Sequence, residues 1–232
     1  MQPHDPLLPH AAETLRTSIG DFTLEEYRLG LGQRTWSVLH TGAMLTWADE
    51  QRYLGDTTAR LPYGVVLWPA AIALAHDVAA RGDALRGARV LELGAGTGLP
   101  GIVAASLGAW VVQTDRNDVA LWVCRRNGER NGVTGVEYRR ADWTQWDDDA
   151  RHDWILGSDI LYAESLHPHL RAILERNLAP GGRALLADPF RAPSLRLLEA
   201  MERDGWTIGL SKWTIGEGDA TRPVGVYELT PP

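Results

Sequence analysis

Short apolar runs alternate with amphipathic stretches along most of the chain. Helical spacing of apolar positions predicts helices near 69–80, 102–107, 118–131, 165–178 and 195–204, and short apolar runs predict strands at 89–93, 110–115, 136–142, 154–158 and 183–188. Strands that alternate with helices in this way are typical of a mostly parallel sheet covered by helices on both faces. The pattern therefore predicts an α/β domain.

The N-terminal part has a different pattern. Phe22 to about Trp47 carries strand-like segments on either side of a glycine turn, which predicts a β-hairpin outside the core. The residues before Gly20 contain several Pro and His residues and are expected to form a loosely attached arm. The polar stretch 49–61 is expected to be a connecting loop.

Two apolar segments near the C-terminus, 206–213 and 224–229, are joined by a polar loop and predict a closing hairpin. Together with the five strands above, this hairpin would give a sheet of seven strands. We therefore expect an N-terminal arm and hairpin over residues 1–60 and an α/β domain over residues 61–232.

The segment Leu91-Glu-Leu-Gly-Ala-Gly-Thr-Gly98 joins the first core strand to a helix. Its three glycines, Gly94, Gly96 and Gly98, allow a sharp turn and close approach of the backbone to a ligand. Such a turn between a buried strand and a helix N-terminus is typical of a nucleotide-cofactor site.

The glycine turn alone does not identify the cofactor, because Gly96-x-Gly98-x-x-Gly101 also satisfies the dinucleotide pattern. Glu92 would repel a pyrophosphate but could pair with an ammonium group. Pro100 removes one of the N–H donors that a pyrophosphate would use. These two residues favour a ligand with an amino-acid ammonium, such as S-adenosylmethionine, over a nicotinamide cofactor.

Carboxylates follow several of the predicted strands. Asp115 ends the second strand, where a carboxylate can accept hydrogen bonds from both ribose hydroxyls of an adenosine group. Asp142 and Asp159 follow the third and fourth strands. Because the carboxyl ends of parallel strands meet at one edge of a sheet, we expect all three carboxylates at the same edge as the glycine turn.

Composition narrows the function classes. The formal net charge is −7, and the absence of a dense Lys/Arg run argues against a large nucleic-acid footprint. Cys124 is the single cysteine and is expected in the core. The histidines of His167-Pro-His169 lack a ligand cluster, so no metal site is expected. With no signal-peptide pattern and no membrane-spanning apolar run, a cytoplasmic protein is expected.

Four segments resemble those of known enzymes. The stretch 91–98 resembles motif I of class I S-adenosylmethionine-dependent methyltransferases, and Asp159-x-x-Tyr162 resembles the D-x-x-Y motif of the protein-lysine methyltransferases in that class. Leu67-Trp68-Pro69 is similar to a segment before motif I in the same group. Asp188-Pro-Phe-Arg191 is similar to the Asp-Pro-Gly-Arg motif of the lysine methyltransferases that modify the β subunit of electron-transfer flavoprotein, but Phe190 replaces the glycine.

The resemblance covers most of the chain from about Tyr63. It implies a Rossmann-like sheet of seven strands with helices on both faces, in which the last strand is antiparallel and lies beside the fifth, plus an N-terminal β-hairpin. It implies direct, in-line transfer of a methyl group from S-adenosylmethionine to a lysine of a protein substrate, with S-adenosylhomocysteine as product. The expected cofactor-binding residues are Trp68, Glu92, Gly94, Ala95, Gly96, Gly98, Leu99, Asp115, Arg116, Asp142, Trp143 and Ser158, the catalytic residues Asp159 and Tyr162, and the substrate-side residues Asp188 and Arg191.

Several alternatives stay open. A class I methyltransferase acting on a small molecule or RNA would share motif I and the strand-end carboxylates. A nicotinamide-dependent oxidoreductase is opposed by Glu92, Pro100 and the lack of a Tyr-x-x-x-Lys pair. A module that holds the cofactor without turnover would also show the glycine turn.

Overall fold

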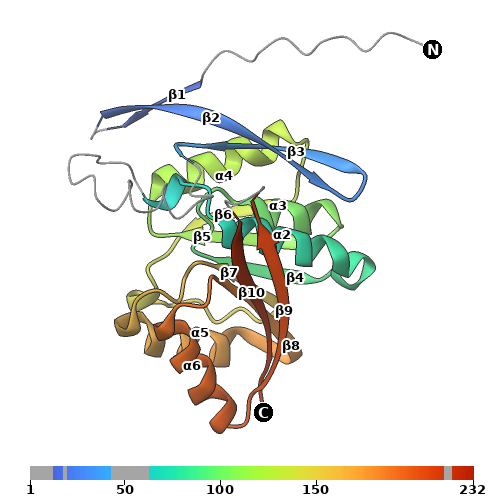
Figure 1. Cartoon of the computed structure of the whole chain (residues 1–232), viewed down its shortest axis with the longest axis vertical. Helices are drawn as coiled ribbons and strands as arrows, with labels where there is room; N and C mark the ends of the chain where they lie inside the picture. Colours follow the sequence, from blue (N-terminus) through green and yellow to red (C-terminus); the bar gives the residue numbers. More distant parts are fainter. Residues whose placement is uncertain (1–12, 18–19, 43–62, 217–220) are drawn as a thin grey trace.

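The computed structural model describes residues 13–17, 20–42, 63–216 and 221–232, and a seven-stranded sheet forms its centre (Figure 1). In chain order, the strands of this sheet are β4 (Arg89–Leu93), β5 (Trp110–Asp115), β6 (Val136–Arg140), β7 (His152–Ser158), β8 (Leu178–Asp188), β9 (Thr207–Ile215) and β10 (Arg222–Thr230). The strand order across the sheet is β6-β5-β4-β7-β8-β10-β9. The predicted seven-stranded α/β fold is confirmed.

The direction of the strands also agrees with the expectation. β4 to β8 run parallel to one another, whereas β10 is antiparallel and lies between β8 and β9. The chain moves outward from β4 to β6 and then returns to add β7 on the other side of β4. The order therefore reverses between β4 and β7, and ligands bind at such a point beyond the carboxyl ends of the strands.

Helices cover both faces of the sheet (Figure 1). They are α2 (Pro69–Arg81), α3 (Leu99–Ser106), α4 (Asp118–Arg130), α5 (His167–Asn177) and α6 (Ala192–Arg203), with the short 3-10 turns η1 (Tyr63–Val65), η2 (Gly82–Leu85), η3 (Trp143–Gln145) and η4 (Glu164–Leu166). α2, α3 and α4 lie on one face, and α5 and α6 lie on the other. Two apolar cores result, one on each side of the sheet.

A second, three-stranded antiparallel sheet comprises β1 (Glu13–Thr17), β2 (Gly20–Leu31) and β3 (Arg34–His40). The predicted hairpin is β2–β3, with Gly32 in the turn at a φ of 59°. The expectation of a loose arm is wrong for 13–17, because this segment pairs with β2. Leu15 is buried there against Leu24 and Leu39. This single apolar side chain, with polar residues on either side of it, attaches the edge strand to the sheet.

The sequence also predicts Ser165 and Ser194 as helix N-caps and Pro180-Gly-Gly182 as a loop before the strand at 183–188, and the structure differs in all three places. Ser165 does not cap α5, because it lies inside the turn η4 and α5 begins at His167. Ser194 does not cap α6, which begins two residues earlier at Ala192 with Arg191 as its N-cap. β8 begins at Leu178, so the segment Pro180-Gly-Gly182 lies within this strand, between Leu178, which pairs with His152, and Arg183, which pairs with Trp154.

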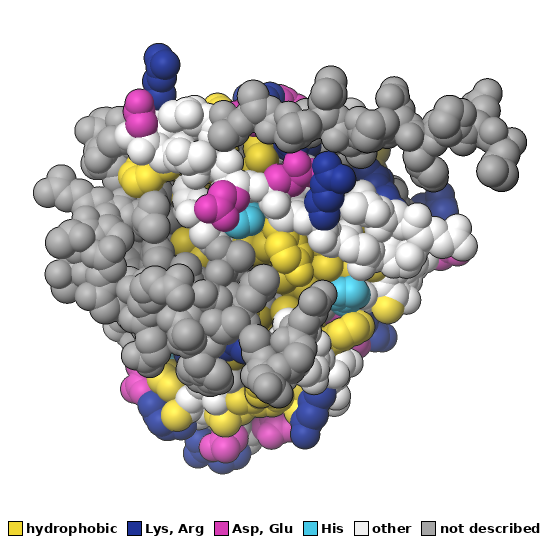
Figure 2. Space-filling model, turned by 45° about the horizontal axis from the view of Figure 1, so that its top comes forward, with side chains coloured by type: hydrophobic (Ala, Val, Ile, Leu, Met, Phe, Trp, Pro, Cys, Tyr) yellow, Lys and Arg dark blue, Asp and Glu magenta, His cyan; other side chains and the backbone are white. Residues whose placement is uncertain are grey.

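Figure 2 shows the side of the molecule that carries the N-terminal sheet, with hydrophobic side chains gathered near the centre of the view. No helix among the described residues is long and apolar enough to cross a membrane. The first twelve residues and the connection expected over 49–61 lie outside the described residues.

Candidate active site

The glycine turn follows β4 and lies beside the point where the strand order reverses. Gly94, Gly96 and Gly98 have φ values of 61°, 58° and 78°, a region that side-chain-bearing residues rarely adopt. A Cβ atom on Gly94 would lie 3.0 Å from Trp143 Cζ2 and 3.1 Å from Ile160 Cγ2. The turns after β6 and β7 therefore pack directly on the glycine loop.

Glu92 is buried beneath this loop. Its Oε2 accepts hydrogen bonds from the Gly101 N–H at 3.1 Å and from Gln113 Nε2 at 2.6 Å. Its exposed fraction is 1%. Burial raises the pKa of Glu92 to about 8, against the lowering effect of these hydrogen bonds, so the carboxyl group is protonated at neutral pH. Through Oε2, Glu92 supports the loop and the start of α3, and its pairing with a ligand ammonium stays a prediction.

Asp115 stands at the end of β5, next to the glycine loop. Its Oδ2 accepts the Gly96 N–H at 3.2 Å and its Oδ1 accepts the Asn117 N–H at 2.9 Å. Burial raises the pKa of Asp115, while the hydrogen bonds from Asn117 and Gly96 act in the opposite direction. A carboxylate has about four acceptor positions, so these two bonds leave capacity for ligand hydroxyls.

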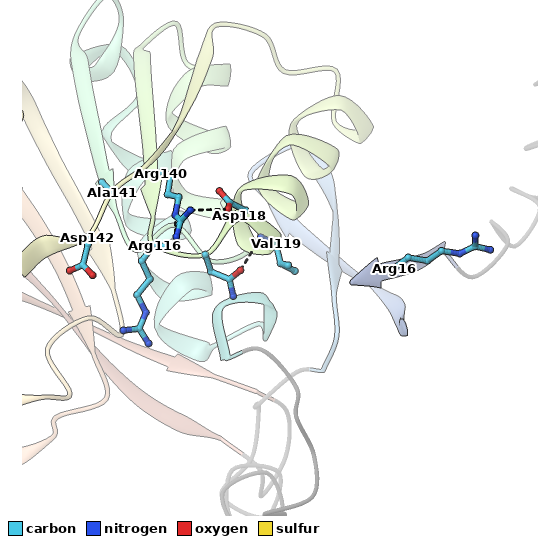
Figure 3. A pocket seen from close by; sticks show the side chains of 8 residues that line it. Arg16, Arg116, Asp118, Val119, Arg140, Ala141 and Asp142 are labelled. Atoms are coloured by element: carbon cyan, nitrogen blue, oxygen red, sulfur yellow. Dashed lines mark hydrogen bonds and ion pairs between the residues drawn. The ribbon is translucent and has the colours of Figure 1, made fainter. Parts of the chain in front are cut away.

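An open depression of about 600 Å³ lies beyond the carboxyl ends of β5 and β6. Figure 3 shows Arg116 and Asp142 reaching out from the two neighbouring loops, Arg140 turned toward Asp118, and Arg16 on the separate strand β1. Asp142 caps η3: its Oδ1 accepts from Thr144 N at 2.9 Å and from Thr144 Oγ1 at 2.7 Å, and these bonds lower its pKa. Its carboxylate is exposed beside this depression.

The loop after β7 carries an ion-pair cluster. Asp159 Oδ1 accepts from Arg191 at 2.5 Å, and the same guanidinium nitrogen lies 3.1 Å from Asp188 Oδ2. The side chain of Asp159 is 8% exposed and that of Arg191 is 25% exposed. Burial lowers the pKa of Arg191, but pairing with Asp159 and Asp188 outweighs it and raises the pKa overall. The backbone of Asp159 has a φ of 55°, and its N–H donates to the Ala187 carbonyl at 2.9 Å.

Asp188 binds Arg191 and the start of α6. Its side chain is fully buried. Oδ1 accepts the Arg191 N–H at 2.7 Å, and Oδ2 accepts the Ser194 hydroxyl at 2.8 Å. Asp188 thus ties the first turn of α6 to the end of β8, and its place on the substrate side stays a prediction.

Phe190 occupies a backbone position that favours glycine. Its φ is 62°, in the left-handed region, which explains why the similar motif has glycine at this place. The Phe190 ring compensates by packing edge-on against Tyr227, with ring centroids 6.3 Å apart.

We expect Phe190→Gly to be more stable than Phe190→Ala by about 1 kcal/mol, the reverse of the usual order. Both variants lose the ring contact, but only Gly relieves the left-handed strain, which costs roughly 1–2 kcal/mol for other residues. Urea unfolding of the two variants measures the difference. Ala being the more stable of the two would contradict the assigned conformation.

The remaining expected site residues fall into three groups. Ala95 and Leu99 are buried within the glycine loop and the first turn of α3. Trp68, Trp143 and Ser158 are partly exposed, at the start of α2, in η3 and at the end of β7. Arg116 and Tyr162 are exposed, and the exposed fraction of Tyr162 is 54%.

Two residues at the site were missed by the sequence reasoning. Tyr227 on β10 is 5% exposed, and its ring lies over Gly225, whose Cβ would meet Tyr227 Cζ at 2.9 Å. Burial, together with the charge of Asp188, raises the pKa of Tyr227 to about 12. Asn127 on α4 donates to the Thr97 carbonyl of the glycine loop at 2.8 Å. Neither residue belongs to a short motif, and only the fold brings them to the site.

The donor set fits S-adenosylmethionine. Asp115 can accept from ribose hydroxyls and Asp142 from an adenine amino group, while the indole of Trp143 lies against Gly94. The left-handed glycines give the close backbone approach that the ligand needs.

Comparisons with known proteins identify the family. A family model described as lysine methyltransferase matches residues 53–194. Protein N-lysine methyltransferase METTL21A of Xenopus tropicalis is 40% identical over 116 residues, which cover 48% of this chain and only 54% of that protein. METTL21A of Danio rerio is 39% identical over 158 residues, which cover 65% of this chain and 72% of that protein.

Two further comparisons extend this result. Histone-arginine methyltransferase METTL23 of Xenopus laevis is 33% identical over 164 residues, covering 66% of this chain and 68% of that protein. The crystal structure of precorrin-6y C5,15-methyltransferase from Geobacter metallireducens has a TM-score of 0.55 at 16% identity, covering 68% of this chain and 86% of that chain, and shows the shared fold. The family match over more than half of the residues shows that the chain belongs to the lysine methyltransferase family of S-adenosylmethionine-dependent methyltransferases.

Proposed function

We propose that this enzyme transfers a methyl group to the side-chain nitrogen of a lysine in a protein substrate. The observation that carries the proposal is the placement of Asp159 and Tyr162 directly after β7, packed through Ile160 against the glycine loop of β4. A carboxylate and an exposed hydroxyl beside the donor site suit an incoming ammonium group. The family and the METTL21A relatives support a lysine acceptor.

S-adenosylmethionine supplies a methyl group that is already activated by the sulfonium charge. The protein therefore acts mainly by positioning. Asp115 and Asp142 hold the nucleoside, and Asp159 attracts and orients the amine. The attacking nitrogen must be neutral and in line with the methyl–sulfur bond. Orientation of the amine by Asp159 is therefore the main contribution of the acceptor-binding residues to the rate.

The ion pair with Arg191 bears on the role of Asp159. The guanidinium stabilises the ionised carboxylate, so Asp159 is suited to electrostatic attraction and less suited to accepting a proton. Tyr162 is exposed at the same loop, so water can reach the amine there. We propose that the lysine proton leaves to solvent and that Asp159 holds the acceptor in place.

Asp115→Ala should weaken binding of S-adenosylhomocysteine by about 100-fold. The variant removes a buried carboxylate that offers hydrogen bonds to two ribose hydroxyls, and such bonds contribute about 1.5 kcal/mol each. Isothermal titration calorimetry measures the change, with Asp118→Ala on the exposed start of α4 as the matched control. An affinity within about threefold of wild type would remove Asp115 from the binding site.

Arginine is the second candidate acceptor. The METTL23 match is a specific observation in its favour, because that relative is a histone-arginine methyltransferase. The carboxylates of Asp159 and Asp188 already bind one guanidinium, that of Arg191. Arg191 repels a lysine ammonium and an arginine guanidinium alike, so this ion pair does not separate the two acceptors. The family and the METTL21A relatives favour lysine.

The test uses labelled S-adenosylmethionine with fractionated protein, RNA and small-molecule pools from the source cells. We expect label in the protein fraction, dependent on the wild-type enzyme and absent with heat-inactivated enzyme. Label confined to RNA or to small molecules would overturn the protein-acceptor proposal. The cytoplasmic location predicted from the sequence stays a prediction.

A further inference from the structure

Asn127 in α4 and Asn131, the C-cap of α4, hold strand β3 in the same way. Asn127 Oδ1 accepts the Leu39 N–H at 2.7 Å, and Asn127 Nδ2 donates to the Leu39 carbonyl at 3.1 Å. Asn131 Oδ1 accepts the Ser37 N–H at 3.0 Å, and its Nδ2 donates to the Ser37 carbonyl at 2.7 Å. The two side-chain amides act as a strand partner for β3 and attach the N-terminal sheet to the α/β domain.

The two residues differ in their further hydrogen bond. Asn127 Nδ2 also donates to the carbonyl of Thr97, in the glycine loop, at 2.8 Å. The second bond of Asn131 Nδ2 goes instead to the Asn127 carbonyl within α4, at 2.8 Å. Asn127 is fully buried, so the Thr97 carbonyl would lose its partner without access to water if this amide were removed.

A second connection joins the same elements. Thr41 N–H donates to the Val65 carbonyl at 3.0 Å, and Leu67 N–H donates to the Gly42 carbonyl at 2.9 Å. The segment that continues β3 thus pairs with the chain around η1. The Gly64 carbonyl there lies 3.2 Å from the position of a Cβ on Gly96. The N-terminal sheet therefore reaches the glycine loop both through Asn127 and through η1.

We propose that Asn127 is a positioning residue for the methyl donor, which couples the N-terminal sheet to the glycine loop. Its amide fixes the Thr97 carbonyl between the left-handed residues Gly96 and Gly98, so that the loop keeps its ligand-binding shape. The cofactor affinity then depends on a sheet that lies outside the seven-stranded core. This inference concerns the donor side only and does not depend on the identity of the acceptor.

Asn127→Ala and Asn131→Ala form a matched pair. Each removes the same two-bond clamp on β3, so we expect similar losses of thermal stability. Only Asn127→Ala removes the bond to Thr97, and we expect it to weaken S-adenosylhomocysteine binding by at least about tenfold, with Asn131→Ala within about threefold of wild type. Calorimetry at a temperature where both variants are folded measures the affinities. Equal affinities for the two variants would overturn the proposal.

A measurement on the wild-type protein tests the coupling between the N-terminal sheet and the glycine loop even if Asn127→Ala does not fold. Coupling between two sites is reciprocal, so saturating S-adenosylhomocysteine should slow amide hydrogen exchange in β3, residues 34–40. The distal edge strand β9 serves as the control for general stabilisation. Protection of the glycine loop with no change in β3 beyond that in β9 would overturn the coupling. Both experiments omit an acceptor, so their failure is distinguishable from failure of the lysine proposal.

Discussion

Asp159→Asn is expected to lower the rate of methyl transfer by at least about 100-fold, with S-adenosylhomocysteine affinity within about threefold of wild type. The charge that attracts and orients the amine is lost, and correct orientation of a reacting group is worth this much or more. Asn tolerates the left-handed backbone at φ 55° and can still accept from Arg191, which keeps Asp188 as its ionic partner. The fold should therefore be retained.

Single-turnover kinetics with labelled donor and saturating acceptor measure this effect. Glu164→Gln is the matched control, because it also removes one carboxylate from an ion pair, with Arg196, on the same stretch of chain but at an exposed position. We expect the control to keep wild-type rates. A rate for Asp159→Asn close to that of the control would mean that Asp159 serves only the structure of the loop.

Glu92→Gln is expected to change the pH dependence of stability. Burial raises the pKa of Glu92 in the folded protein to about 8 from a usual value of 4.5. Between these pH values the folded state keeps a proton that the unfolded state has lost, so the free energy of unfolding falls as pH rises from about 4.5 to 8. Gln is neutral throughout and can still accept from Gly101 and Gln113. The variant should match wild type near pH 4.5 and be more stable by the order of 3 kcal/mol at pH 8.

Urea unfolding between pH 4.5 and 9 measures this difference, and calorimetry with S-adenosylhomocysteine gives a second readout. The position of Glu92 beneath the loop predicts an unchanged affinity. Glu137→Gln, on the exposed part of β6, is the control and should leave both profiles unchanged. A large loss of affinity in Glu92→Gln would show that the carboxylate reaches the ligand ammonium.

The sequence predicted the sheet and the strand-end positions because they depend on local patterns. Apolar runs, the glycine turn and the carboxylate of Asp115 each carry their signal within a few residues. The order of the strands came from the resemblance. The direction of a side chain could not be predicted from local patterns. Glu92 belongs to motif I, but its burial beneath the loop depends on a hydrogen bond from Gln113 in the next strand.

Contacts between distant segments account for the other differences. Asp188 was predicted on the substrate side from its motif alone, and the motif did not indicate that its carboxylate binds Arg191, the N-cap of α6, and Ser194 in the first turn of that helix. Serine is a residue type that often caps helices, yet the Ser194 hydroxyl donates a hydrogen bond to Asp188 instead. Asn127 resembles an ordinary residue at the end of a helix, and its role arises only because β3 and the glycine loop both lie against it.

Identification of the methylated residue is the most direct test of the proposal that the enzyme methylates a lysine of a protein. A protein labelled by the wild-type enzyme would be hydrolysed to amino acids and digested in parallel for tandem mass spectrometry. We expect methyl-lysine at one or a few defined sites. It should be absent when Asp159→Asn replaces the wild-type enzyme. Label recovered as methyl-arginine would contradict the lysine acceptor and assign the enzyme the activity of the METTL23 relatives.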